Sequence, residues 1–543
     1  MGFYLPTECL QKILSYIDEE DISTQYSCLL VNRIWHDNTL PILWRRPFAY
    51  VKPKYSHKVL HELLLLLPNE VKKKLGLLMI NLKPINNYAR FIRDIDYLHL
   101  VVAVDTWWSS DLRNEFVNNL LLPNGSKVRP DSPMPPAPYF CDVETFSACY
   151  LQATTALERE KFICELCKLI LSQANRIDRL ALDLEKLSDD YVNNVVEIPR
   201  MPEAQISLAN IREFVCKGHF PKEHVFREMA KYCLNIDSLE VGNRLRWDRP
   251  RWSAANETCS ALAQLISVQR KLRKFVLIEW KIKDLELFNA LKTQSESLKH
   301  FEMYKSSISN CGPLTALSKC CNLEIFKMDA CFGTTSIHMK PLTYRAFPKL
   351  RHFTYIDTIY PDVPEFDNEW DPPVEEFAAI MSNAGQYLVE VTLGMDKKNY
   401  PVIFKTLSQF CPNVKKYVAV IEWASDIMHL MPGIASSCPN LEELSIEVLM
   451  KTFHPSEELI NLVGTLPSSL QYFRINACAE FFGEDLTTFM NKCPPKLKEF
   501  TWLTSCTSCE RYMQLSHERF KEYKVSLSSE GERRHHLILK SVN

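Results

Sequence analysis

Glycine is scarce in this chain, with only 13 among 543 residues. No two glycines have the spacing of a dinucleotide-binding turn or of a P-loop, so the sequence contains neither of these phosphate-binding motifs. The G-x-S-x-G elbow of hydrolases and the H-E-x-x-H zinc motif are missing too. These absences argue against the common nucleotide-dependent and hydrolytic enzymes. We expect no catalytic residue, no cofactor and no bound metal ion.

An excess of one charge and a long apolar run are also lacking. Lys and Arg total 64 against 66 for Asp and Glu, which argues against binding nucleic acid through bulk positive charge. The longest apolar run, Leu63 to Leu67, stops at Pro68 and is too short to cross a bilayer. No signal peptide is visible, so the 19 cysteines suggest reduced thiols. We expect a cytoplasmic or nuclear protein that binds neither nucleic acid nor membrane.

The first 48 residues are dense in apolar side chains and predict three short helices. Leu10, Ile13, Leu14 and Ile17 recur at the spacing of one helical face. Pro6 suits the first turn of this helix, because an N–H in the first turn has no intrahelical partner. The first helix is therefore expected to include Pro6 in its first turn.

Two further helices are predicted after an acidic turn. Asp21 can cap the second helix, whose N-terminus favours negative charge, and this helix carries Tyr26 and Leu30. The third begins near Ile34 and is expected to be interrupted at Pro41, because a helix interior tolerates proline poorly. A segment of this size cannot easily bury so much apolar surface alone. It therefore suggests a docking module for a partner protein.

This segment resembles an F-box, the docking module of substrate receptors in cullin-RING ubiquitin ligases. The resemblance rests on Leu5-Pro6, Ile13-Leu14, Leu29, Val31-Asn32-Arg33, Trp35 and Leu43-Trp44. It implies that an exposed apolar face binds the small adaptor subunit of these ligases and, through it, a cullin. The adaptor-facing or module-core residues are then Leu5, Pro6, Ile13, Leu14, Leu29, Val31, Trp35, Leu43 and Trp44. Sequence does not divide them between the two roles, and a three-helix cap of a larger core is the alternative.

A repeated pattern, apolar-x-x-apolar-x-apolar, runs through the rest of the chain. Its copies begin at Ile177, Ile236, Leu272, Leu298, Leu323, Leu350, Leu388, Val414, Leu441, Leu470 and Leu497, with Ile95/Leu98/Leu100 as a plausible first copy. From 388 to 497 the steps are 26, 27, 29 and 27 residues. A fixed period of this size indicates a solenoid.

The repeats resemble the leucine-rich-repeat family, in which each short strand follows a helix. We expect an α/β fold: a small three-helix F-box, then a right-handed horseshoe with parallel inner strands and outer helices. The predicted boundaries are 1–50 for the F-box, 51–90 for linker helices, 91–509 for the solenoid and 510–543 for a cap or tail. Insertions are expected near 105–150 and 357–375, and Lys72 to Lys74 as a solvated continuation of the linker helix 57–67. The leucine-rich-repeat pattern places a polar Asn or Cys after each strand, and in this chain only Cys331 and Cys478 match that position.

Four cysteines have a fixed place in the repeat. Cys233, Cys320, Cys411 and Cys438 each precede the first apolar position of their unit by three residues, which predicts buried thiols at helix ends. The pair Cys164 and Cys167, with Cys216 and His219 downstream, is a conceivable zinc set. It falls in an amphipathic helical pattern over 162–170, however, which favours a structural role.

Target-binding candidates come from a loop and from the strands. Arginine forks grip phosphate or carboxylate, and tryptophan faces attract cations, which makes the loop after the Ile236 strand a candidate. Residues between the apolar strand positions point away from the core and form the second group. The candidates are Arg246, Arg249, Arg251, Trp252, His300, Tyr304, His352, Tyr472 and Arg474. A self-contained surface loop and ordinary solvated strand positions are the alternatives.

We predict a non-catalytic, substrate-recognition subunit of an SCF-type ubiquitin ligase. The F-box would bind the adaptor, and the leucine-rich repeats would bind an unknown target protein. A leucine-rich-repeat scaffold that uses the F-box in a non-ligase complex is the second interpretation. An enzyme with a dispersed active site is the third, although the residue pattern gives no hint of one.

Overall fold

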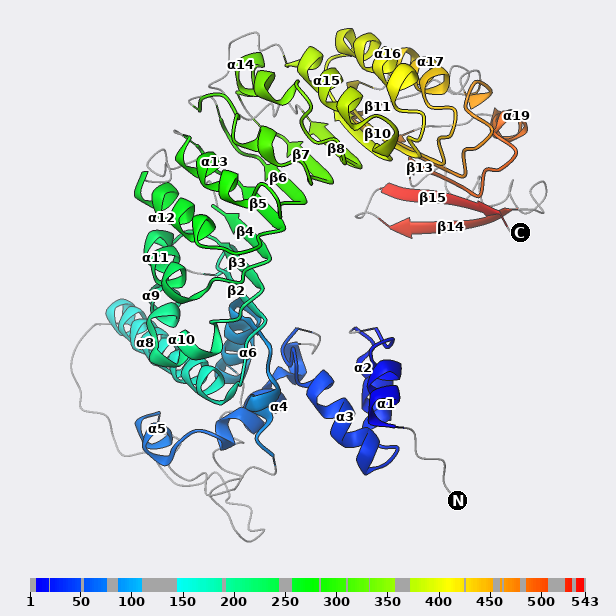
Figure 1. Cartoon of the computed structure of the whole chain (residues 1–543). Coiled ribbons are helices and arrows are strands. Elements are labelled where there is room, and N and C mark those ends of the chain that lie inside the picture. Colours follow the sequence, from blue (N-terminus) through cyan, green and yellow to red (C-terminus); the bar gives the residue numbers. More distant parts are fainter. Residues whose placement is uncertain are drawn as a thin grey trace. The chain divides into compact units, whose positions relative to one another are not determined.

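In the computed structural model of the chain, the described residues are 6–18, 20–49, 53–75, 86–109, 144–187, 192–243, 256–282, 285–308, 311–331, 333–356, 372–423, 426–452, 460, 463–478, 485–505, 523–529 and 534–541. They fall into two compact units (Figure 1). The N-terminal unit comprises Met1–Arg244 and Val268–Arg270, and the C-terminal unit comprises Leu245–Ser267 and Lys271–Asn543. The predicted horseshoe shape of the whole arm depends on how the units join and stays a prediction.

Three short helices open the N-terminal unit: α1 Thr7–Leu14, α2 Ile22–Leu29 and α3 Arg33–Leu43. Two side-chain caps fix where the later helices begin. The Asp21 carboxylate accepts the Thr24 N–H at 3.0 Å, as predicted for the start of α2. The Asn32 side chain accepts the N–H groups of Ile34 and Trp35 at 2.9 and 3.0 Å. These caps satisfy N–H groups that have no partner inside their helices.

Proline behaves differently from prediction at both ends of this module. Pro6 is the N-cap residue of α1 rather than a residue of its first turn, and its carbonyl accepts the Leu10 N–H at 3.0 Å. The prediction that Pro41 interrupts the third helix is wrong, because α3 continues through Pro41 to Leu43. Pro41 lies in the last turn, so its missing N–H removes a single backbone bond there.

The linker contains two helices rather than one, α4 Pro53–Leu65 and α5 Asn69–Lys74, separated at Pro68. The prediction that Lys72 is solvated is wrong. This side chain is buried, and its Nζ donates to the Leu65 carbonyl at 3.0 Å, which satisfies an acceptor at the end of α4. Burial lowers the pKa of Lys72. The neighbours Lys73 and Lys74 are exposed, as expected.

Four parallel strands form the sheet of the N-terminal unit: β1 Asp94–Asp96, β2 Arg179–Asp183, β3 Glu213–Lys217 and β4 Ser238–Gly242. Its remaining helical elements are η1 Tyr88–Phe91, α6 Tyr97–Ser109, α8 Glu144–Gln173, α9 Val192–Glu197, η3 Ile198–Arg200, α10 Pro202–Ser207 and α11 Lys222–Tyr232. Equivalent residues stand side by side, because Leu180 pairs in register with Ile95 and Phe214. This repetition of strand and helix is the predicted solenoid.

Two repeat predictions in this unit need correction. Ile95 lies in β1, but Leu98 and Leu100 lie in α6, so the proposed first copy is not a complete strand motif. A copy that the pattern search does not include is β3, whose Phe214 and Cys216 are buried in register with Leu180 and Leu182. Cys216 is therefore a core residue of a strand.

The C-terminal unit has nine parallel strands, β5 Lys274–Ile278, β6 His300–Tyr304, β7 Ile325–Asp329, β8 His352–Ile356, β9 Glu390–Gly394, β10 Lys416–Trp423, β11 Glu443–Thr452, β12 Tyr472–Cys478 and β13 Glu499–Ser505. Its helical elements are α12 Asn256–Ser267, α13 Glu286–Leu291, η4 Lys292–Gln294, η5 Leu317–Lys319, α14 Ser336–Met339, η6 Lys340–Leu342, α15 Val374–Ala384, η7 Gly385–Tyr387, η8 Lys397–Asn399, α16 Tyr400–Phe410, α17 Ile427–Ser437 and α19 Asp485–Lys492. The predicted cap contains a hairpin: β15 Arg534–Ser541 pairs antiparallel with β13, and β14 Tyr523–Ser529 pairs with β15.

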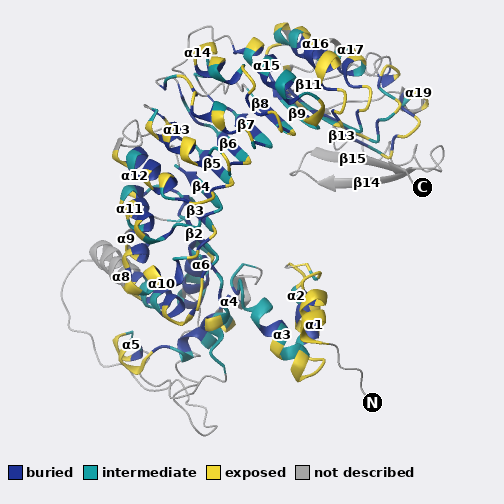
Figure 2. Cartoon of the chain, viewed as in Figure 1, coloured by how far each residue is buried: buried dark blue, intermediate teal, exposed yellow. Residues whose placement is uncertain are grey.

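The core of each unit lies between its strands and its helices (Figure 2). In the C-terminal unit the second strand position forms an aromatic row, with ring centroids 6.2 Å apart from Phe275 to Phe301 and 5.8 Å from Phe301 to Phe326. Phe353 continues the row at 6.0 Å from Phe326. Stacking of equivalent side chains explains why one apolar pattern recurs at each strand.

Small polar groups tie successive repeats together. The predicted buried thiols are confirmed: Cys233 and Cys411 lie at helix ends and donate to the Leu208 and Met381 carbonyls of the preceding repeats, each at 3.4 Å. Cys331 donates to the Met303 carbonyl at 3.4 Å after its strand, as the family pattern predicts. Ser306 takes the equivalent role one repeat earlier, so the sequence prediction for this position is incomplete.

A backbone relay runs beside the strands. The Arg93 carbonyl accepts the N–H groups of Asp178 and Arg179 at 2.7 and 3.1 Å, and the Asp178 carbonyl does the same for the next repeat. The relay starts in the helical module, because the Arg45 carbonyl accepts the N–H groups of Arg93 and Asp94 at 3.0 and 3.2 Å. The module is thus joined to the solenoid by the contact that joins one repeat to another.

Candidate protein-binding surfaces

Helix α2 buries one polar side chain, while a large apolar side chain within it and another at its C-cap are exposed. It buries Gln25 and Cys28, whereas Tyr26 is 57% exposed and Leu30 is 72% exposed. The Gln25 amide donates to the Asp18 carbonyl at 3.1 Å, so the buried polar group is satisfied. Large apolar side chains are normally buried, so the exposure of Tyr26 and Leu30 needs another explanation.

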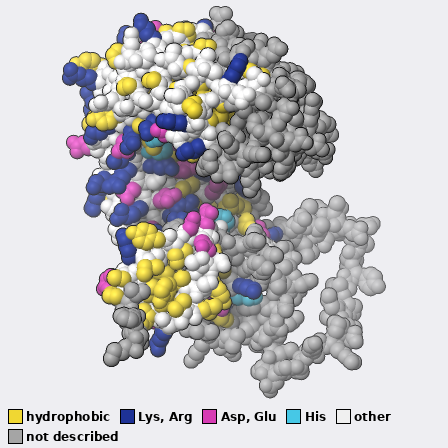
Figure 3. All heavy atoms as spheres, turned by 90° about the vertical axis from the view of Figure 1, so that its right-hand side faces the viewer, with side chains coloured by type: hydrophobic (Ala, Val, Ile, Leu, Met, Phe, Trp, Pro, Cys, Tyr) yellow, Lys and Arg dark blue, Asp and Glu magenta, His cyan; other side chains and the backbone are white. Residues whose placement is uncertain are grey.

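The large apolar side chains that this module exposes are here called, together, the N-terminal apolar face: Ile13, Tyr16, Tyr26, Leu30, Val31 and Ile34. The small interior of the module consists of Leu10, Leu14 and Cys28, against which Ile17, Trp35 and Ile42 pack. Hydrophobic side chains gather over the N-terminal helices in Figure 3. Six large apolar groups in a module with so small an interior are typical of a protein-binding surface.

The structure divides the nine predicted adaptor or core residues. Leu14 is buried, and Trp35 packs on the interior cluster, so these two serve the module core. Ile13 and Val31 are exposed on the N-terminal apolar face, and Pro6 is exposed at the start of α1. Leu29 is half-buried, and Leu5 lies outside the described residues. The last two, Leu43 and Trp44, are half-buried at a separate cavity.

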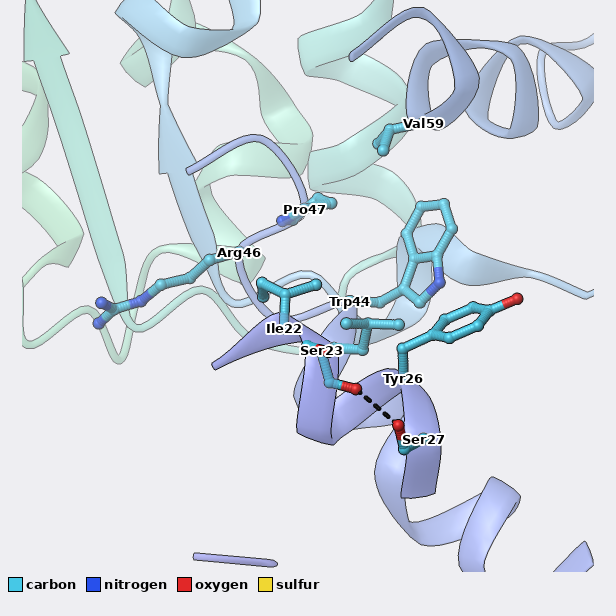
Figure 4. A pocket seen from close by; sticks show the side chains of 9 residues that line it. Ile22, Ser23, Tyr26, Ser27, Trp44, Arg46, Pro47 and Val59 are labelled. Atoms are coloured by element: carbon cyan, nitrogen blue, oxygen red, sulfur yellow. Dashed lines mark hydrogen bonds between the residues drawn. The ribbon is translucent and has the colours of Figure 1, made fainter. Parts of the chain in front are cut away.

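This cavity has a volume of about 400 Å³ and opens between the module and α4. It is lined by Ile22, Ser23, Tyr26, Ser27, Leu43, Trp44, Arg46, Pro47 and Val59. In Figure 4, Val59 and Pro47 lie on one side of the Trp44 indole and Tyr26 on the other. The Ser27 hydroxyl is bonded to the Ser23 carbonyl at 2.9 Å, which leaves apolar surface as the main lining. Tyr26 belongs both to this cavity and to the N-terminal apolar face, so the two surfaces are continuous.

An ion network holds the end of the module against β1 and β2. Arg46 Nε lies 3.0 Å from Asp94 Oδ2, and Arg179 Nη1 lies 3.0 Å from Asp94 Oδ1. Burial raises the pKa of Asp94, while the two arginines act in the opposite direction. Arg179 also pairs with Glu213 at 3.0 Å. The charges on this strand face therefore satisfy one another.

Tyr16, Tyr26, Leu30 and Ile34 are absent from the predicted set, although they are among the most exposed apolar groups of the module. The family pattern selects positions shared with other F-boxes and ignores these. Tyr26 lies in α2, Leu30 at its C-cap and Ile34 in α3, so no single helical spacing joins them and the sequence gives no signal for the set.

The predicted strand-face residues of the C-terminal unit share one side of its sheet. His300 contacts Glu302 at 2.9 Å, and His352 contacts Glu390 at 2.9 Å. These hydrogen bonds lower the pKa of both Glu302 and Glu390. Tyr304 is half-buried on the same side.

Tyr472 and Arg474 are the exposed members of the predicted strand-face set. Tyr472 stands in register between Glu443 and Glu499, and Arg474 stands between Ser445 and Thr501. The strand face therefore presents groups of mixed character, with partners for the histidines and open positions at β12.

Several predictions concern segments outside the described residues. These are the loop with Arg246, Arg249, Arg251 and Trp252, and residues 110–143 and 357–371 of the two predicted insertions. Cys164 and Cys167 lie in α8, and Cys167 is buried, as expected for an amphipathic helix. Over the described ranges, no group of three or more potential metal ligands occurs. Nor does any helix among those residues have the length and apolar character needed to cross a membrane.

Comparison with known families and structures gives one match for the module. Residues 3–50 match the family model described as F-box-like. Among solved structures, the chain is similar to the leucine-rich repeat-containing protein LegL7 from Legionella pneumophila at 11% identity and a TM-score of 0.28, covering 55% of this chain and 93% of that one. No curated protein matches. The solenoid assignment accordingly rests on the strand register and the buried rows described above.

Proposed function

We propose that this chain, whose residues 3–50 form an F-box-like module, is the substrate-recognition subunit of an SCF-type ubiquitin ligase. The N-terminal apolar face binds the small adaptor subunit and, through it, a cullin. The solenoid holds a target protein. The site of this activity is cytoplasmic or nuclear, where such ligases meet their targets.

The exposure of Tyr26 in α2 and of Leu30 at its C-cap is the observation that carries this proposal. Burying one large apolar side chain contributes roughly 1.5–3 kcal/mol. Six such side chains would then contribute roughly 10 kcal/mol or more, which is of the size needed to offset the entropy lost on association. A module that only capped the solenoid would gain this energy by turning Tyr26 and Leu30 inward. Their outward position supports a partner that covers them.

Catalysis in this proposal comes from proximity, and the chain supplies no reacting group. A target held at a fixed place relative to a ubiquitin-loaded enzyme reacts as if it were highly concentrated. Such an arrangement requires a stiff joint between module and solenoid. The relay from the Arg45 carbonyl and the Arg46–Asp94 ion pair supply this joint.

The test uses the full chain with Leu30→Asp, and Ile206→Asp as the matched control. Both residues are exposed apolar side chains, at 72% and 79%, but Ile206 lies on α10, away from the module. Affinity for a purified adaptor of this ligase class is measured by biolayer interferometry. We expect Leu30→Asp to weaken binding at least tenfold, because a charge would be buried at the centre of the contact. The control should bind like the natural chain.

Unchanged adaptor binding by Leu30→Asp would contradict the proposal. Adding the cullin to the adaptor complex then separates the two interpretations of the module. A ternary complex supports the ligase, whereas an adaptor complex that excludes the cullin supports the non-ligase scaffold. Circular dichroism of both variants checks that the helices remain folded.

A further inference from the structure

Strands β7 to β11 follow one another in the sheet (Figure 1), and their register aligns three parallel rows of residues on the side facing away from the core. The first row is Ile325, His352, Glu390, Lys416 and Glu443. The second is Lys327, Thr354, Thr392, Val418 and Ser445. The third is Asp329, Ile356, Gly394, Val420 and Glu447. We call these fifteen residues the strand-face track.

The first row is satisfied internally. His352 bonds to Glu390 at 2.9 Å, and Lys416 lies 3.8 Å from Glu390 and 3.4 Å from Glu443. Alternating groups along the row thus neutralise one another. This row lies along one edge of the track, and its charged groups already have partners, so it is not part of the proposed binding site.

The third row has an apolar middle with a carboxylate at each end. Gly394 lies between Ile356 and Val420, and a Cβ atom on it would come within 2.9 Å of the Ile356 side chain and 3.0 Å of the Val420 side chain. Glycine therefore keeps a low apolar floor, while Asp329 and Glu447 stand at its two ends.

The two carboxylates lack ion pairs with any described residue. Asp329 is half-buried, and burial together with Glu302 and Glu447 raises its pKa to about 6. Lys305 and Lys327 face it and act in the opposite direction without cancelling this effect. A half-buried carboxylate on the strand face that has no ion pair is a candidate for binding a cation.

The second row supplies an independent observation. Thr354 is 8% exposed and Ser445 is 5% exposed, and both side chains point toward the track. Neither hydroxyl has a hydrogen-bond partner among the described residues. Polar groups of nearly buried residues normally find hydrogen-bond partners, so these two hydroxyls are free to bond the backbone of a bound chain.

We propose that the strand-face track binds a basic, extended segment of the target protein. A lysine or arginine side chain of that segment lays its methylene stem on Ile356, Gly394 and Val420 and brings its cation to Asp329 or Glu447. The hydroxyls of Thr354 and Ser445 bond the backbone of the segment. This inference rests on the proposed function, since it names the chemistry of the target.

The strand face of the N-terminal unit does not offer the same opportunity. There Lys217 pairs with Glu240, and Arg179 pairs with Asp94, Asp96 and Glu213. These four carboxylates are therefore already paired with a lysine or an arginine of the chain itself. The contrast assigns the basic segment to the track of the C-terminal unit.

The test measures binding of a fluorescein-labelled decapeptide of alternating lysine and serine to the full chain by fluorescence anisotropy. The variant Asp329→Asn with Glu447→Gln keeps side-chain shape and removes both charges. It should fold, because Asp329 is only half-buried, Glu447 is exposed and both replacements keep the side-chain shape. The control, Glu197→Gln with Glu228→Gln, removes two charges from helices α9 and α11.

We expect the track variant to bind the lysine peptide at least tenfold more weakly and the control to bind it within twofold of the natural chain. A matched glutamate–serine peptide should not bind. Equal loss of peptide affinity in both variants would show an effect of net charge and would overturn the proposal. Unchanged peptide binding by the track variant would also overturn it. Adaptor affinity, measured on the same samples, should stay constant. If the natural chain did not bind the adaptor, the proposed function would be contradicted, but the conclusion about peptide binding would be unaffected.

Discussion

The Trp44 indole stacks on the Tyr88 ring, with centroids 4.3 Å apart and planes 11° from parallel. Trp44 ends helix α3 of the F-box-like module, and Tyr88 begins η1 beside the first strand of the solenoid. The stack lies next to the relay from the Arg45 carbonyl to Arg93 and Asp94. An aromatic contact and a backbone contact therefore hold the same joint.

The joint should behave as a coupled pair in a double-mutant cycle. Trp44→Ala and Tyr88→Ala should each destabilise the N-terminal unit, and the double variant should lose less than both losses added. A coupling of about 0.5–1.5 kcal/mol is expected for a stacked pair of this geometry. The coupling is measured by urea denaturation, with unfolding monitored by far-ultraviolet circular dichroism, a backbone signal that does not depend on Trp44. Strictly additive losses would mean that the rings do not support each other in solution.

Lys222 should make the stability of the N-terminal unit depend on alkaline pH. Its side chain is 2% exposed, donates to the Gly218 carbonyl and to Asn243 Oδ1 at 2.7 Å, and lies 4.7 Å from the centroid of the Phe220 ring. Burial lowers the pKa of Lys222 to about 8 from its ordinary 10.5. Between these two values the unfolded chain binds more protons at this site than the folded chain. Stability from this residue therefore rises with pH through that window.

The variant Lys222→Met removes this dependence. Relative to it, the natural chain should gain roughly 1–2 kcal/mol of unfolding free energy between pH 8 and pH 10. Urea titrations at both pH values give the difference, and Lys231→Met, at a more exposed lysine of the same helix, should show none. A constant difference between natural chain and Lys222→Met would show that the lysine is not desolvated.

Gly433 should resist replacement even though it lies in helix α17. Alanine is ordinarily the better helix former by about 1 kcal/mol. A Cβ atom at this position would stand 2.2 Å from two ring carbons of Phe404 on α16, however. Overpacking of this kind costs about 1–3 kcal/mol, so the clash should win and Gly433→Ala should lower the unfolding free energy.

Adding Phe404→Leu to Gly433→Ala should restore part of the stability, because the smaller side chain makes room for the new methyl group. Ser436→Ala, at an exposed position of α17, serves as the control for helix propensity. Thermal unfolding of the four proteins decides the matter. A Gly433→Ala variant as stable as the control would disprove close packing of the two helices.

The sequence predicts most strands because each repeat must bury the same three positions. Leu298, Phe301 and Met303 are all fully buried, and the next repeat places equivalent residues beside them. Strand β3 is not predicted because its third apolar position is Cys216, a residue that is also a conceivable zinc ligand. The first copy fails after Ile95 because α6 begins directly after β1, and an apolar helix can satisfy the same short pattern.

The face that α2 turns inward could not be predicted. Its apolar residues lie on more than one side, and a single sequence does not reveal that Gln25 finds the Asp18 carbonyl. The strand-face track has a different origin. Its members are visible as alternating strand positions, but only the register between strands shows that Gly394 separates two carboxylates.

The Arg45 carbonyl has a practical consequence for dissecting this chain. Cutting away the first fifty residues would strip β1 of the acceptor for Arg93 and Asp94 and remove the arginine that neutralises Asp94. In a shortened protein the edge strand β1 would thus have unpaired N–H groups, which favour pairing with a neighbouring chain. Such a fragment can lose target binding through self-association alone. Single substitutions of surface residues therefore test target binding more cleanly than truncation.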